Sequence, residues 1–265
     1  MDILHVIGYV GAVFVGLMLG LVGGGGSILT VPILIYLFSL DAITSTSYSL
    51  FIVAVSSAIG TISNFKNQLI NYKTSLFFLI SSSLAIFLTR NFILPTIPET
   101  IISFSGFTLT KDIFILVMFS LLMIASSFSM IRKTQFSSDS GTKELQIPQL
   151  LLIGFSVGLL TGFVGAGGGF IIVPALYFLA GLEIKNAIAT SLFIIAVNSS
   201  IGFMSDFHRQ SIDWTLLFSY SFLAVIGILS GQKLTKRISN EKLKPIFGWF
   251  VLIMGIFIFV RELFF

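Results

Sequence analysis

The chain has 265 residues, of which 55% are hydrophobic, 10% are charged and none is cysteine, and its formal net charge is +4. A soluble domain carries roughly 25% charged residues, so a chain with a mean hydropathy of +1.04 is expected to be surrounded mostly by lipid. The lack of cysteine excludes disulfides and cysteine-bound metals, and membrane topology explains the modest positive charge better than nucleic-acid binding does.

The first half contains five apolar segments, at about residues 3–22, 28–38, 46–63, 74–89 and 113–131. The first has no basic stretch and no small-residue cleavage site, so we expect an uncleaved membrane helix rather than a removable signal peptide. The second has only about 11 residues, too few to cross a ~30 Å hydrocarbon layer at about 1.5 Å per residue. It follows a glycine run and contains Pro32, which either bends the segment or is tolerated near its first turns. We predict a half-helix or re-entrant arm here.

A polar stretch, QFSSDSGTKELQ, separates the halves and has little to bury. It predicts a cytoplasmic linker over residues 132–147, between a first membrane repeat at residues 1–131 and a second at residues 148–265. The second half again has five apolar segments, at about residues 148–164, 170–180, 187–205, 214–230 and 245–260. The second of these is short as well, and Pro174 within it allows the same two interpretations as Pro32.

The two halves are copies of one unit. When Gly158 is placed on Gly16, GLMLGLVGGGGSILTVPILIYL falls on GLLTGFVGAGGGFIIVPALYFL, and SLFIVAVSSAIG falls on SLFIIAVNSSIG without a gap. Glycines, prolines and the pair Gln68 and Gln210 keep this repeat register, which chance similarity between apolar helices would not produce. Repeats in membrane proteins are typical of transporters, with the site at the interface between the repeats.

Lysine and arginine predict the orientation. If residues 132–149 and 231–244 are cytoplasmic, most basic residues fall inside, and Arg90, Lys111, Arg209 and Arg261 fall outside. This places both termini outside a bacterial-type inner membrane and gives each half an odd number of segments. We therefore expect an all-α polytopic bundle of two inverted repeats, each with a glycine-rich loop and a short helix. If only one short segment crosses, the repeats become parallel.

The segment GLLTGFVGAGGGFIIVPALYFLAGLEIKNAIATSLFIIAVNSSIGF resembles the TauE/SafE family, the sulfite exporter and sulfonate uptake permeases. So do its partner GLMLGLVGGGGSILTVPILIYLF and the pair DFHRQSIDW and NFKNQLINY. The specific pattern is a glycine run, a valine-proline a few residues later, and a helix that begins with a TSLF-like sequence. The resemblance covers most of the chain. It implies a permease for sulfur-containing anions such as sulfite, sulfonates or thiosulfate.

The two glycine runs are candidate anion sites. Glycine permits positive φ and close approach to the backbone, and each run precedes a short helix whose N-terminus presents free N–H groups and about half a positive charge. Two such N-termini facing each other would hold an oxyanion without a buried lysine or arginine, and no basic residue is expected in the middle of a segment. The predicted substrate-binding residues are Gly23, Gly24, Gly25, Gly26, Ser27, Ser49, Gln68, Gly165, Gly167, Gly168, Gly169, Thr190, Ser191, Asn198 and Gln210.

Small residues also serve helix packing. We favour that role for the outlying glycines spaced four apart, Gly16, Gly20, Gly158 and Gly162. Asn198 either faces the substrate path or bonds to a neighbouring helix. Asp206 and His208 are the titratable pair that could carry a coupling proton, although their place at a membrane edge favours a solvated loop pair.

The leading hypothesis is a secondary transporter, coupled to protons or to the membrane potential, because no GxxxxGKS or GxxxxGKT sequence is present to bind ATP. A passive anion channel of the same architecture is the alternative. The chain has two histidines and no HExxH sequence, so we expect no enzyme, no catalytic residue, no metal and no cofactor. A structural scaffold would not explain the duplicated glycines. The expected partners are a small anion and membrane lipid, without nucleic acid, and a homodimer is left open.

Overall fold

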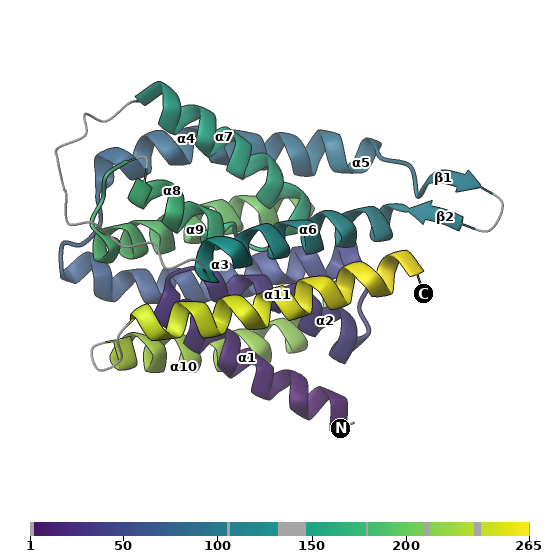
Figure 1. Ribbon diagram of the computed structural model, residues 1–265, viewed down its shortest axis with the longest axis horizontal. Coiled ribbons are helices and arrows are strands. Elements are labelled where there is room, and N and C mark those ends of the chain that lie inside the picture. Colours follow the sequence, from purple (N-terminus) through teal and green to yellow (C-terminus); the bar gives the residue numbers. More distant parts are fainter. Residues whose placement is uncertain are drawn as a thin grey trace.

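The structure is a computed structural model that describes residues 3–104, 107–131, 147–178, 180–208, 212–235 and 240–264 (Figure 1). In the first half it contains α1 (Ile3–Val22), a short 3-10 helix η1 (Gly25–Leu29), α2 (Thr30–Phe38), α3 (Ala42–Lys66), α4 (Tyr72–Leu88), a π-helical turn η2 (Thr89–Ile93), α5 (Leu94–Thr96), β1 (Thr100–Phe104), β2 (Phe107–Thr110) and α6 (Lys111–Ile131). In the second half it contains α7 (Ile147–Val164), α8 (Gly169–Phe178), α9 (Ile184–Asp206), α10 (Trp214–Thr235) and α11 (Asn240–Phe264). Apart from Ile147, which begins α7, the predicted linker lies outside the described residues.

Eight helical spans among the described residues are long and apolar enough to cross a membrane. This confirms the predicted all-α polytopic membrane fold. α2 and α8 have 9 and 10 residues, which corresponds to lengths of about 14 and 15 Å at about 1.5 Å per residue. Both are therefore too short to cross a ~30 Å hydrocarbon layer, as the sequence predicted.

Two features differ from the predicted elements. The span that begins with α4 continues through η2 and α5 to Thr96, whereas the apolar segment was expected to end near residue 89. The turns of η2 and α5 still contain large apolar side chains, so the single arginine at residue 90 does not end the helical span. β1 and β2 then form an antiparallel hairpin, an element absent from the predicted all-helical arrangement. Their β-branched and aromatic residues favour strands.

α1 and α2 form an antiparallel pair. Gly26, just before α2, lies against the backbone of α1 near Leu19, and Ile33 in α2 lies against Gly11. Phe38, at the end of α2, stacks on His5 near the start of α1, with ring centroids 5.1 Å apart. The chain thus enters the bundle along α1 and returns along α2 to the end from which it started.

The two halves run in opposite directions through the bundle. Both termini lie toward the end that carries the β-hairpin, whereas α6 ends and α7 begins at the opposite end (Figure 1). Among the described helices, two of the four most extensive contacts exchange partners between the halves, since α1 packs on α10 and α4 packs on α7. The remaining large contacts, α3 with α9 and α6 with α11, join elements at equivalent positions of the two halves. The helices of the two halves are therefore interleaved.

The starts of α4 and α10 are held in the same way. The side chain of Asn71 caps α4 by accepting from the Thr74 amide, and its own backbone N–H donates to the hydroxyl of Thr190 in α9 over 3.0 Å. Asp213, the counterpart of Asn71 in the repeat register, caps α10, and its N–H donates to the hydroxyl of Tyr48 in α3 over 2.6 Å. Each half therefore fixes one helix start of the other.

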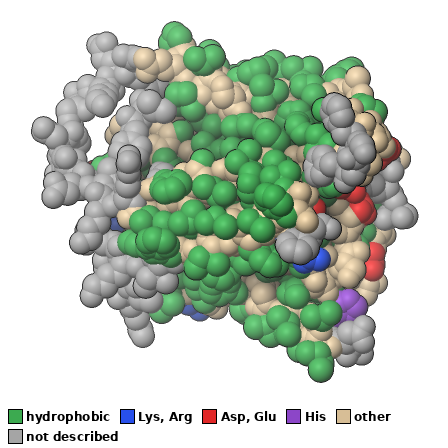
Figure 2. Space-filling model, turned by 45° about the vertical axis from the view of Figure 1, so that its right-hand side comes forward, with side chains coloured by type: hydrophobic (Ala, Val, Ile, Leu, Met, Phe, Trp, Pro, Cys, Tyr) green, Lys and Arg blue, Asp and Glu red, His purple; other side chains and the backbone are tan. Residues whose placement is uncertain are grey.

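The outer surface is apolar around the middle of the bundle. Figure 2 shows one face covered largely by hydrophobic side chains, with acidic side chains and a histidine gathered at one end. Large hydrophobic side chains of α4, α10 and α11 are exposed, including Leu84, Phe222 and Ile253. A surface of this kind requires lipid rather than water around it.

Candidate functional site

The glycine runs make the sharp turns that join α1 to η1 and α7 to α8. Gly23 and Gly24 have φ of 76° and 152°, and Gly165, Gly167 and Gly168 have φ between 67° and 70°. Residues other than glycine rarely adopt positive φ values of this size. The runs are therefore needed for the turns themselves, whatever else they do.

The two glycine turns meet in the interior of the bundle. A Cβ atom added to Gly24 would lie 2.5 Å from the Cα of Gly169, so the two backbones are in direct contact. Each turn also lies on the long helix of the opposite half: Gly23 contacts Ile188 in α9, and Gly165 contacts Thr46 in α3. In this structure the glycine turns are packed together, and an anion would fit between them only after they separate.

The outlying glycines serve close helix packing, as expected. A Cβ on Gly16 would overlap the backbone carbonyl of Ala224 in α10, and a Cβ on Gly158 would overlap that of Ser82 in α4. The register that places Gly158 on Gly16 also places Ala224 on Ser82, so one sequence offset relates the two contacts.

Buried hydroxyls without a hydrogen-bond partner surround the second glycine turn. The Ser199 hydroxyl lies 3.0 Å from the Cβ position of Gly167, and the Thr161 hydroxyl fills the Cβ position of Gly168. Both residues are buried, and neither hydroxyl has a partner among the described residues; the same holds for Ser49, one turn along α3 from Thr46. Leaving a buried hydroxyl unpaired costs about 1–3 kcal/mol. These groups are unused donors beside the turn.

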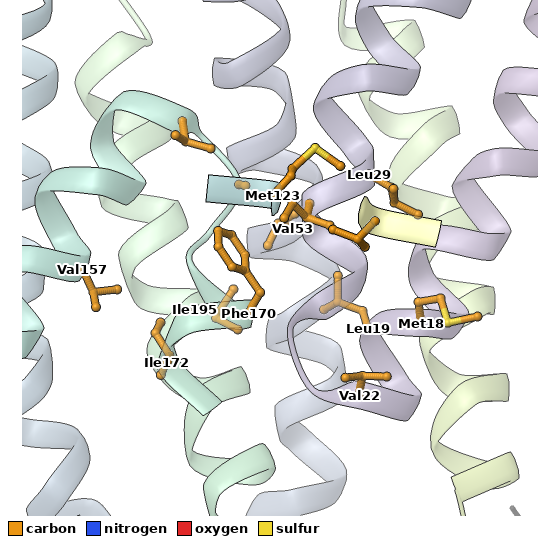
Figure 3. Close-up of a cluster of buried hydrophobic side chains, with 14 of the residues drawn as sticks. Met18, Leu19, Val22, Leu29, Val53, Met123, Val157, Phe170, Ile172 and Ile195 are labelled. Carbon is orange, nitrogen blue, oxygen red and sulfur yellow. The ribbon is translucent and has the colours of Figure 1, made fainter. Parts of the chain in front are cut away.

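α8 begins directly after the part of the turn that these hydroxyls contact. The carbonyl of Gly168 accepts from the N–H groups of Ile171 and Ile172, both over 3.0 Å. The first two amides of the helix, those of Gly169 and Phe170, have no carbonyl one turn earlier within the helix to bond to. The remaining surroundings are apolar, since Val53, Phe170 and Ile195 belong to one buried cluster (Figure 3).

Several predicted site hydroxyls are already occupied. The Ser27 hydroxyl donates to the carbonyl of Gly24 over 2.7 Å, and the Ser191 hydroxyl lies 2.8 Å from the carbonyl of Gly23. The Thr190 hydroxyl accepts from the Asn71 amide. Ser27 and Ser191 therefore fix the first glycine turn in its present shape.

The amide side chains lie apart from the glycine turns or bond elsewhere. Gln68 is exposed on the turn between α3 and α4, with a positive φ of 54°, and Gln210 lies outside the described residues. Asn198 bonds to Ser82 and Ser83 of α4 over 2.9 Å each. Of the two alternatives for Asn198, the structure shows the bond to a neighbouring helix.

A buried ion pair corrects the prediction that no basic residue lies inside a segment. Arg90, in η2, is fully buried, and its Nη1 atom lies 2.7 Å from Oδ2 of Asp206 at the end of α9, which is 5% exposed. Neither residue is therefore at the outer surface, and Asp206 is not part of a solvated loop pair. His208 is exposed, and its ring contacts Phe207 instead. The pair was missed because its partners are 116 residues apart in the sequence.

The corresponding place in the other half is neutral. In the repeat register, Arg90 corresponds to Gln232 and Asp206 to Asn64. Gln232 in α10 donates to the carbonyl of Gly60 in α3 over 2.7 Å, and Asn64 donates to the same carbonyl over 3.4 Å. The repeat thus carries a charged pair toward the end with the termini and an amide pair toward the opposite end.

In the described part of the chain, eight spans long and apolar enough to cross a membrane, two short helices inside the bundle and an interior meeting of glycine turns define a multi-pass helical membrane protein. The chain belongs to the sulfite exporter TauE/SafE family, whose model matches residues 9–258. It is similar to a probable membrane transporter protein of Xylella fastidiosa (strain 9a5c), with 26% identity over 254 residues that cover 94% of this chain and 92% of the relative. It is also similar to the probable membrane transporter protein YunE of Bacillus subtilis (strain 168), with 27% identity over 249 residues that cover 86% and 88%. No solved structure matches it.

The family and these relatives identify the chain as a membrane transporter and not an enzyme. The resemblance expected from the glycine run, the valine-proline and the TSLF-like helix start is confirmed.

Proposed function

We propose that the protein is a secondary transporter that moves a small sulfur-containing anion, such as sulfite, a sulfonate or thiosulfate, across a bacterial-type inner membrane. The anion is held by backbone amides of the glycine turns and by the hydroxyls beside them. The observation that carries this proposal is the pair of buried, unpartnered hydroxyls of Thr161 and Ser199 against Gly168 and Gly167.

The chemistry of the second glycine turn suits an oxyanion. The N-terminus of α8 concentrates about half a positive charge, and its first amides lack acceptors within the helix. A sulfur oxyanion offers several acceptor oxygens at once, so it would satisfy these amides and the two hydroxyls together.

The contact between Gly24 and Gly169 supports alternating access rather than a permanently open pore. Because each turn is anchored on the opposite half, a relative movement of the two halves would separate the turns and make room for the anion. A passive anion channel of the same architecture remains the second candidate. Concentrative uptake that disappears when a protonophore is added would distinguish the transporter from the channel.

We propose that the end of the bundle with the α6–α7 connection faces the cytoplasm and that both termini lie outside. Lys66 and Lys73 lie at this end, on either side of the α3–α4 turn. Lys185 at the start of α9 and Lys233 near the end of α10 lie there too. A surplus of lysine on one side marks the cytoplasmic face. Lipid then covers the apolar surface of Figure 2.

The test is uptake of radiolabelled sulfite, thiosulfate and sulfoacetate into proteoliposomes, with acetate and chloride as competing anions. Uptake of a labelled sulfur anion that acetate and chloride do not inhibit supports the proposal, and a wild type that takes up none of the three sulfur anions would refute it. The double variant Thr161→Val, Ser199→Ala then tests the site. Because neither hydroxyl has a partner among the described residues, we expect stability to be kept or raised, whereas transport falls at least about tenfold.

The matched control is Ser156→Ala, which removes an exposed hydroxyl of α7 that bonds to the carbonyl of Leu152. It should transport like the wild type. A double variant with unchanged transport would remove the second glycine turn from the mechanism, even if the wild-type protein moves sulfur anions.

A further inference from the structure

The buried pair of Arg90 and Asp206 is not needed for packing alone. Burying two charges costs several kcal/mol per ion before their attraction is counted, so neutral groups of similar size often serve a fold equally well. The other half demonstrates this, because Gln232 and Asn64 occupy the corresponding places in the same register. An ionisable pair kept inside a membrane span is by default a functional group.

The pair is joined to the second glycine turn. Nη1 of Arg90 also lies 3.3 Å from the hydroxyl of Thr46, and Thr46 is the residue of α3 that packs on Gly165. Ser49, one turn further along α3, has a fully buried hydroxyl without a partner. A cation therefore lies one side chain away from the proposed anion site.

The first glycine turn has no such neighbour in the described part of the chain. There Gly23 packs on Ile188, the apolar counterpart of Thr46, and the place of Arg90 is taken by Gln232. The positive charge is thus present on one side of the meeting glycine turns, toward the end with the termini. Arg90 also lies in a π-helical turn, a local distortion found frequently at functional sites.

We propose that Arg90 binds the transported anion in place of Asp206, whose carboxylate leaves the guanidinium when it takes up a proton. In the present structure the carboxylate, 2.7 Å from Nη1, occupies the position of an anionic group. This assignment rests on the proposed function and adds the residue that couples a proton to the anion.

The charges balance in this exchange. Without cargo, the guanidinium and the carboxylate sum to zero. When one proton binds Asp206 and a monoanion such as hydrogensulfite or a sulfonate binds Arg90, the sum is again zero and no unpaired charge is left inside the bundle. A dianion such as thiosulfate leaves one negative charge for the amides and hydroxyls of the glycine turn. A proton and an anion therefore enter and leave together, and the proton gradient drives transport.

Arg90 is the charged group that faces Asp206 from η2. Thr46 of α3 contacts Arg90, and its hydroxyl does not titrate. Just beyond the end of α9, the nearby titratable residue among the described residues is His208, which is exposed and contacts Phe207. The proposal therefore assigns the proton to Asp206 rather than to His208.

The experiment compares the wild type with Asp206→Asn and with the double variant Arg90→Gln, Asp206→Asn, which copies the amide pair of the other half. The probe is radiolabelled thiosulfate in proteoliposomes, with sulfite as a second probe, and a trapped pH dye reports proton entry. For Asp206→Asn we expect uptake that no longer responds to an imposed proton gradient and no longer acidifies the lumen. For the double variant we expect a KM raised at least about tenfold, since a hydrogen bond to a charged group contributes about 1.5–3 kcal/mol. Gln232→Ala is the control and should keep the wild-type KM and gradient response.

The outcomes separate the two proposals. A wild type that moves neither probe overturns the proposed function and this role with it. A wild type that transports, together with a double variant that keeps both its KM and its gradient response, overturns the role of the pair alone. A double variant that no longer elutes as a monodisperse protein would assign the pair to packing and overturn the role as well.

Discussion

Replacing Asn198 with alanine should weaken the junction between α9 and α4. Its Nδ2 atom donates to the Ser82 hydroxyl over 2.9 Å, and its Oδ1 atom accepts from the Ser83 hydroxyl over 2.9 Å. A third close contact, from the Ser82 hydroxyl to Oδ1 over 3.2 Å, competes with the 2.7 Å bond from the same hydroxyl to the carbonyl of Phe78. One hydroxyl has one proton, so Asn198 makes two bonds between the helices.

The magnitude follows from these two bonds. Hydrogen bonds between membrane helices contribute about 0.6 kcal/mol on average and up to about 1.7 kcal/mol. Asn198→Ala should therefore lower the free energy of unfolding by roughly 1.2 kcal/mol, and by no more than about 3.4 kcal/mol from the hydrogen bonds. In a double-mutant cycle with Ser82→Ala, the coupling energy should be about 0.6 kcal/mol, because the two side chains share one of the bonds.

The assay is reversible unfolding in bicelles, read by steric trapping or by denaturant, for the wild type, both single variants and the double variant. Ser200→Ala serves as a control, because among the described residues that hydroxyl bonds within its own helix, to the carbonyl of Ala196. Wild-type stability of Asn198→Ala with lost transport would refute the role as a helix link and would place Asn198 on the substrate path.

Two further predictions concern packing and orientation. Gly16→Ala should cost about 1–3 kcal/mol of stability, because the new methyl group meets the backbone of Ala224. Gly11→Ala should cost less, because the atom that its methyl group meets is the flexible end of Ile33. Equal thermal melts of the two variants would contradict this prediction. Since the chain has no cysteine, Asn67→Cys and Glu99→Cys can each be labelled in intact cells with an impermeant maleimide. Glu99→Cys should react at once, and Asn67→Cys should react only after permeabilisation. The reverse order would mean that the proposed topology is inverted.

The sequence was sufficient to predict the features that repeat. The register of Gly23 with Gly165 and of Pro32 with Pro174 predicted two equivalent glycine turns and two short helices, because turn geometry and helix length are local properties. The same spacing predicted the packing role of Gly16 and Gly158. It could not predict how tightly the turns meet, since Gly24 and Gly169 come into contact only through the arrangement of the whole bundle.

The charged pair illustrates what a single sequence conceals. Arg90 stands at the apparent end of an apolar segment, and a lone arginine at a membrane edge is usually a topology signal. Its partner lies 116 residues away, and nothing local to either residue indicates the contact. Extending the repeat register past Tyr72 would have placed Arg90 on Gln232 and exposed the charge difference. The unpartnered hydroxyls of Thr161 and Ser199 likewise become visible only when their neighbours are known.

The exchange of helix partners between the halves also bears on how the protein is made. α1 reaches its main neighbour only when α10 has been synthesised, and α4 reaches its own only when α7 has been synthesised. During translation, the grooves left by Gly16 and Gly20 remain open to lipid until most of the chain has been inserted. Neither half is thus expected to persist as an independent folding unit. A chain that is truncated before α10 should be degraded by proteases rather than retain part of the transport activity.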